Sequence, residues 1–133
     1  MKLNILVINS RNDFSEKLTS FIGELGHQID FIESGEAGLD LIVDKKHHLV
    51  IVNENLIDTN AQDFIIKASQ KKVFCHSAFL LATSNSLDEM NKIRFMSLGF
   101  SYFMTTNFDE INLQIVKSSI QDEINMMPML SAA

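Results

Sequence analysis

Short apolar runs alternate five times with amphipathic segments along this chain, and that alternation restricts it to few folds. The apolar runs cover residues 3–8, 29–31, 49–52, 78–82 and 102–104. They are too short for helices and are typical of buried strands. Each is followed by apolar residues at spacings of three and four, which marks one face of a helix. Because parallel strands need such crossovers, the pattern predicts an α/β fold of the (βα)5 type, a doubly wound five-stranded parallel sheet.

The composition fits one globular domain that works in the cytoplasm. The chain has 133 residues, 46% of them hydrophobic, and a formal net charge of −6. A nucleic-acid partner is not expected, because such proteins need a basic surface. Nor is a membrane partner, since no apolar run approaches membrane-spanning length. A single cysteine suits a reducing compartment. We expect the domain to cover residues 1–125, with residues 126–133 as a C-terminal tail or the start of a linker to a further domain.

The carboxyl ends of the predicted strands are where a functional site is expected. In open parallel sheets, sites form in the crevice outside those ends. The first strand is followed by Asn9 and Ser10, the third by Asn53, the fourth ends in Thr83, and the fifth is followed by Thr105 and Thr106. A site at this edge is therefore built from amides and hydroxyls.

These stretches resemble the receiver domain of bacterial two-component response regulators, over about residues 1–125. In that family the first strand ends in an acidic pair that holds Mg²⁺, and the third ends in the aspartate that accepts phosphate. The fourth ends in Thr or Ser, and the fifth in a lysine. The resemblance implies a flavodoxin-like receiver fold and a role in two-component signalling.

The chain departs from the family at the positions that carry the chemistry. Asn9 and Ser10 stand at the acidic pair, Asn53 at the phosphate acceptor, and Thr106 at the lysine. Two family features are kept: Thr83 and, as the switch aromatic, Phe103. We expect the substituted amides and hydroxyls to hydrogen-bond one another across the pocket.

The resemblance and these departures together predict a pseudo-receiver that cannot be phosphorylated. Neutral side chains do not offset the dehydration of Mg²⁺, so no magnesium or other metal is expected. The amide of Asn53 is a poor nucleophile, and no cation takes the place of the family's lysine. We therefore expect no enzyme activity, no catalytic residue and no cofactor. Arg11 is the one cation near the pocket and could fold over it toward Glu54 or Asp58, although a solvated arginine is the commoner outcome.

A protein partner is the expected ligand, either another protein or a second copy in a homodimer. In the resembled family, the surface of the fourth helix, fifth strand and fifth helix is the usual partner face. Ile111 and Ile115 form an apolar pair one helical turn apart, and Phe95 and Phe103 are expected to border the same face. The alternative is that these side chains only widen the core.

Two other functions stay open from the sequence. One is regulation by a small ligand in the vacated phosphorylation pocket. The other is a flavodoxin-like cofactor binder, which needs a glycine-rich phosphate loop after the first strand, whereas residues 9–13 contain no glycine. Outside the pocket, His47 and His48 are expected to form a polar turn at the opposite end of the sheet. Cys75 is a weak candidate for a reactive thiol.

Overall fold

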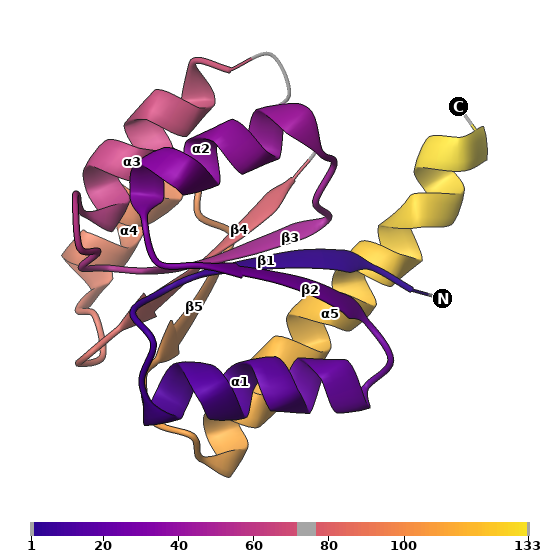
Figure 1. Ribbon diagram of the computed structural model, residues 1–133, viewed down its shortest axis with the longest axis horizontal. Coiled ribbons are helices and arrows are strands. Elements are labelled where there is room, and N and C mark those ends of the chain that lie inside the picture. The colour runs from indigo at the N-terminus through magenta and orange to yellow at the C-terminus, as the bar shows by residue number, and fades with distance from the viewer. Residues whose placement is uncertain (1, 72–76, 133) are drawn as a thin grey trace.

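The computed structural model describes residues 2–71 and 77–132, so the prediction for Cys75 lies outside the described residues. The chain forms one five-stranded sheet of parallel strands in the order β2-β1-β3-β4-β5. Figure 1 shows α1 and α5 on one face of the sheet and α2, α3 and α4 on the other. The predicted doubly wound (βα)5 fold is confirmed. The strands are β1 (Asn4–Ile8), β2 (Gln28–Ile32), β3 (Leu49–Asn53), β4 (Ala78–Thr83) and β5 (Tyr102–Thr105), and the helices are α1 (Asp13–Glu24), α2 (Gly35–Asp44), α3 (Ala61–Ser69), α4 (Glu89–Leu98) and α5 (Glu110–Ala132).

Each face of the sheet has its own hydrophobic core, because successive side chains of a strand point to opposite faces. On β1, Leu6 and Ile8 pack toward α2 and α3, whereas Ile5 and Val7 pack toward α1 and α5. All four are fully buried. The three central strands are apolar on both faces, as expected for a sheet covered on both sides.

Polar side chains begin the helices at the carboxyl edge of the sheet. Asn12 precedes α1 and forms a reciprocal capping box with Ser15, with N···O distances of 2.9 Å. Ser34, Asn60 and Asp88 cap α2, α3 and α4 in the same way, each accepting a backbone N–H of the first turn. These caps satisfy N–H groups that have no partner inside the helix.

Gly38 allows α2 to lie against the last residue of β1. A Cβ atom at this position would stand 2.5 Å from the Cδ1 atom of Ile8. No other amino acid fits there unless Ile8 moves, and Ile8 is the residue immediately before Asn9.

The last helix, α5, has 23 residues. It continues to Ala132 and so takes in most of residues 126–133, whose role as a tail or the start of a linker stays a prediction. In Figure 1 its C-terminal part extends beyond the strands. In the described part of the chain, no helix is both long enough and apolar enough to span a membrane.

Candidate functional site

The parallel sheet brings the predicted pocket residues to one edge. Asn9 and Thr83 are buried, each 3% exposed, while Ser10, Asn53 and Thr106 are half-buried. The Thr106 N–H donates to the Thr83 carbonyl oxygen at 2.9 Å, which joins the ends of β5 and β4. A polar hollow of about 470 Å³ opens at this edge. It is lined by Asn12, Asp13, Phe14, Asn53, Ser84 and Thr106.

The pocket side chains bond to their own loops, which differs from the expected bonding across the pocket. The Asn53 Oδ1 accepts the Asn55 N–H at 3.0 Å. The Thr83 hydroxyl donates to the Asn85 carbonyl oxygen at 2.7 Å. Short-range bonds form because each side chain sits at the start of a turn, where unpaired backbone groups are within reach. Each side chain therefore fixes a turn at the pocket edge.

Arg11 does not fold over the pocket. Its guanidinium carbon lies 5.3 Å from the centre of the Phe31 ring on β2, a cation–π contact. The Glu54 carboxylate accepts the Ser84 N–H at 2.8 Å instead. The alternative in which Arg11 replaces the metal ion is wrong, because an aromatic ring on the neighbouring strand holds the guanidinium.

Asp58 is engaged at the start of α2. Its carboxylate accepts the Ser34 hydroxyl and the Gly35 N–H, both at 2.8 Å, and the Glu36 N–H at 3.1 Å. These hydrogen bonds lower the pKa of Asp58 below its usual range, and the bond from the Ser34 hydroxyl has the largest effect. Asp58 therefore ties the β3–α3 loop to α2.

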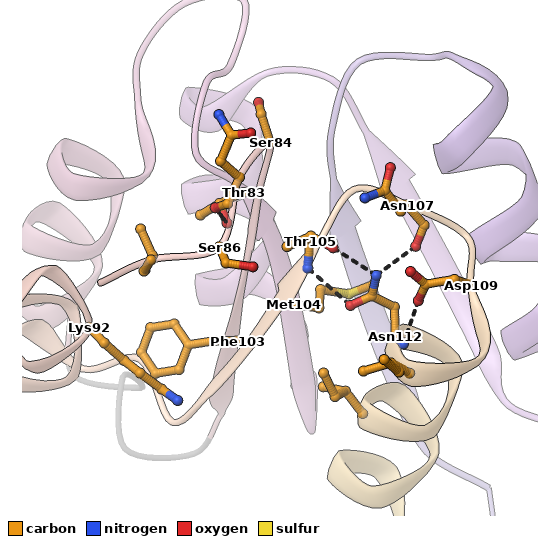
Figure 2. Close-up of a pocket in the computed structure, with 14 residues that line it drawn as sticks. Thr83, Ser84, Ser86, Lys92, Phe103, Met104, Thr105, Asn107, Asp109 and Asn112 are labelled. Atoms are coloured by element: carbon orange, nitrogen blue, oxygen red, sulfur yellow. Dashed lines mark hydrogen bonds between the residues drawn. The ribbon is translucent and has the colours of Figure 1, made fainter. Parts of the chain in front are cut away.

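Sequence analysis missed Asn112, which organises the turn between β5 and α5 (Figure 2). Its side chain is buried, donates to the Thr105 hydroxyl and to the Asn107 carbonyl oxygen at 2.8 Å each, and accepts the Thr105 N–H at 3.1 Å. The Asn112 N–H donates to the Asp109 carboxylate at 2.9 Å. In the sequence, Asn112 stands one helical turn before Val116, which indicates that it lies on the face of α5 that packs on the sheet.

A second hollow, of about 480 Å³, lies beside the pocket, between the β4–α4 loop and the start of α5. Figure 2 shows Phe103 on β5 facing this space, with the Lys92 side chain alongside the ring. The Lys92 Nζ is 5.6 Å from the ring centre. Phe103, the predicted switch aromatic, thus stands between the pocket edge and the surface of α4 and α5.

The face formed by α4, β5 and α5 carries exposed apolar side chains. Ile111 is 74% exposed, while Phe103 and Ile115 are half-buried. The expectation for Phe95 is wrong: it is 8% exposed and packs edge-on against Phe100, with ring centres 5.9 Å apart. The reason is that α4 turns this large ring toward the sheet. Three apolar residues on the rest of α4 remain exposed, namely Met90, Ile93 and Met96.

Comparison with known proteins gives the fold but no close relative. No family model matches the chain, and no curated protein matches it. Among solved structures, the signal receiver domain of a Vibrio parahaemolyticus protein is similar, with a TM-score of 0.82 and 15% identity over 99% of this chain and 97% of that one.

Two further solved structures give the same result. Chemotaxis response regulator CheY4 of Vibrio cholerae has a TM-score of 0.80 and 11% identity, covering 92% of this chain and 99% of that chain. A CheY-like receiver domain from Methylobacillus flagellatus has a TM-score of 0.74 and 18% identity, covering 90% and 99%. The chain has the receiver fold. The predicted architecture is therefore confirmed.

Proposed function

We propose that this chain is a pseudo-receiver, a signalling module that takes no phosphoryl group and acts by binding a protein. The observation that carries this proposal is the chemistry at the carboxyl edge of the sheet. Asn9, Ser10, Asn53 and Thr106 stand where phosphoryl transfer in the receiver family requires carboxylates and a lysine.

The contacts around the pocket support the proposal. The carboxylates that approach this edge have other partners: Glu54 binds the Ser84 N–H and Asp58 binds the first turn of α2. Asp13, which lines the pocket, is paired with Lys17 on α1 at 3.1 Å. A hard divalent cation prefers several carboxylate oxygens arranged around one point, and these three carboxylates are directed to different partners.

Treatment with acetyl phosphate and Mg²⁺ tests the chemical half of the proposal. The intact mass of the wild type should stay unchanged, because an amide does not form an acyl phosphate. The matched positive control is the variant Asn9→Asp, Ser10→Asp, Asn53→Asp, Thr106→Lys, which restores the family's groups and should gain one phosphoryl group. A phosphoryl adduct on the wild type, at any residue of the pocket, overturns the proposal.

The surface proposed for the partner is the α4–β5–α5 face. Its exposed apolar side chains include Met96, 54% exposed, and Ile111. They flank a hollow of about 720 Å³ that Phe103 and Lys92 also line. Contiguous exposed apolar surface on a small soluble domain is typical of a protein-binding site.

Charge substitution on this face tests the partner half. Met96→Glu with Ile111→Glu should abolish self-association or capture of a partner, measured by analytical ultracentrifugation and by pull-down, without lowering the melting temperature. The control is Ile57→Glu, which places one such charge on another exposed isoleucine, 67% exposed, in the β3–α3 loop. Ile115 is a poor choice because it also packs against the core beneath α5. Equal association by all three proteins would place the partner site elsewhere.

The polar hollow beside Asn53 supports a second candidate function, regulation by a small ligand. Asp13 is the single charged residue among those that line it, so the hollow suits a neutral or cationic polar molecule. A ligand should raise the melting temperature of the wild type and not of Asn53→Trp, whose indole would fill the space. A screen in which both proteins respond equally would exclude this pocket.

A further inference from the structure

Two histidine side chains bind the backbone where β1 begins. The Leu3 N–H donates to the Nδ1 of His27 at 3.1 Å. The next N–H along the chain, that of Asn4, donates to the Nδ1 of His48 at 2.9 Å. Both imidazoles are half-buried.

The two histidines lie on opposite sides of β1, one before each neighbouring strand. Next to His27, the Gln28 N–H donates to the Leu3 carbonyl oxygen at 2.9 Å, the start of the β1–β2 pairing. On the other side, the His48 N–H donates to the Asn4 carbonyl oxygen at 2.8 Å, ahead of the β1–β3 pairing. Each imidazole therefore supplies the acceptor that the strand ladder lacks at its first N–H group.

Both hydrogen bonds require a neutral imidazole. A ring nitrogen accepts a hydrogen bond only while it carries no proton, so Nδ1 must be bare and Nε2 must hold the hydrogen. Protonation turns Nδ1 into a donor that faces another donor, the backbone N–H. Both contacts with β1 are then lost and replaced by repulsion.

The surroundings favour the neutral form at both sites. Burial, followed by the positive α-amino group, lowers the pKa of His27 below its ordinary value of 6.5. Burial, followed by the positive charge of Lys46, lowers the pKa of His48, and His47 acts in the same direction. The carboxylate on the adjacent strand, Asp30, is bound by His47 and Lys45.

We propose that His27 and His48 form a pH-sensitive clasp that holds the amino end of β1 when both are neutral and releases it when they are protonated. The clasp is independent of the proposed function, because it lies at the edge of the sheet opposite the pocket. It acts on the strand whose other end carries Asn9.

The sign of the effect follows from linkage. Because folding lowers both pKa values, the unfolded chain binds protons more readily than the folded one. The contribution of the clasp to stability is complete above pH 6.5 and is lost as the pH falls through the two lower, folded values. Within that window, each site reduces the folding equilibrium constant by up to about tenfold per pH unit.

The test compares two pairs of amide variants that differ only in where they place an acceptor. In His27→Asn with His48→Asn, the amide oxygen occupies the position of Nδ1 and does not titrate. In His27→Gln with His48→Gln, the matched control, it occupies the position of Nε2 and does not reach the N–H groups. Urea unfolding and exchange of the Leu3 and Asn4 amide protons are measured at about pH 8 and about pH 5.

The wild type should lose both stability and Leu3 and Asn4 protection at the lower pH. The Asn pair should keep its stability and the protection of the Leu3 and Asn4 amide protons at both pH values. The Gln pair should lack that amide protection even at the higher pH. Scalar coupling across the N–H···N bonds, seen by NMR at the higher pH only, would show the contacts directly. Equal pH dependence in the wild type and the Asn pair, or full protection in the Gln pair, overturns the clasp.

Discussion

The two edges of the sheet differ in the kind of polar group they present. At the carboxyl edge, where receivers perform their chemistry, the side chains at the strand ends are neutral: Asn9, Asn53, Thr83 and Thr106. The amino edge holds His27, His48 and a cluster in which Asp30 binds both His47 and Lys45, at 2.8 and 2.9 Å. At the amino edge, titratable side chains thus lie directly beside the strand starts, whereas at the carboxyl edge the strand ends carry neutral side chains.

This difference shows that charge has separate uses at the two edges. Charges at a catalytic edge must stay available to a ligand, and their mutual repulsion weakens the fold without one. Charges at the amino edge are paired with one another and with the backbone, so they contribute to stability and make it depend on pH. Substitutions at the two edges should therefore lower the free energy of unfolding by different amounts.

The largest loss is expected at the amino edge, for Asp30→Ala. His47 is 0% exposed at its side chain, and its Nδ1 has no hydrogen-bond partner among the described residues. Removing Asp30 leaves both ring nitrogens unpaired and Lys45 without its carboxylate. We expect the free energy of unfolding to fall by about 3 kcal/mol, measured by urea unfolding at neutral pH.

The control for this variant is Asp40→Ala, which removes an exposed carboxylate on α2. The hydrogen bond from His47, followed by that from Lys45, lowers the pKa of Asp30 below its ordinary value of 3.8. The contribution of Asp30 is therefore present above pH 3.8 and is lost as the pH falls through the folded value. If the free energy of unfolding of Asp30→Ala fell as steeply at acid pH as that of the wild type, this assignment would be contradicted.

A smaller loss is expected at the carboxyl edge, for Asn112→Ala. The variant leaves the Thr105 N–H without its acceptor and the Asn107 carbonyl oxygen without its donor. We expect a loss of about 2 kcal/mol and faster exchange of the Thr105 amide proton. Gln114→Ala is the control because its side chain is exposed two residues away. If the two variants unfold alike, the Asn112 network does not hold this turn.

The smallest loss is expected for Asn12→Ala, which removes the capping box of α1. The Ser15 N–H loses its side-chain acceptor, and the expected cost is that of a lost N-cap, about 1 kcal/mol. Thermal unfolding of this variant and of Ser20→Ala, an exposed site on the same helix, measures the difference. If Asn12→Ala lost more stability than Asn112→Ala, the ranking of these two variants would be wrong.

The sequence predicted the sheet because the five apolar runs are short and bounded by polar turns. It also placed Asn9, Asn53, Thr83 and Thr106 at one edge, because parallel strands end together. It did not predict where their hydrogen bonds go. Those bonds depend on the exact backbone of the turns after each strand, which the side-chain pattern does not specify.

Long-range contacts account for the other differences. Phe31, which holds Arg11, is twenty positions along the chain and becomes a neighbour only when β2 pairs with β1. On α4, Ile93 and Met96 share one side of the helix and Phe95 lies on another, and periodicity does not decide which side meets the sheet. The structure buries Phe95, which brings a large aromatic surface to the core.

Gly38 determines how closely α2 packs against the end of β1. A Cβ atom at position 38 would stand 2.5 Å from the Cδ1 atom of Ile8, so the absence of a side chain at Gly38 sets how near α2 lies to β1. The same helix is held at its first turn by the hydrogen bonds from the Gly35 and Glu36 N–H groups to Asp58, so the position of α2 is set both from β1 and from the β3–α3 loop. A bulkier residue at position 38 would require a shift of the Ile8 side chain, next to Asn9, or of α2 itself.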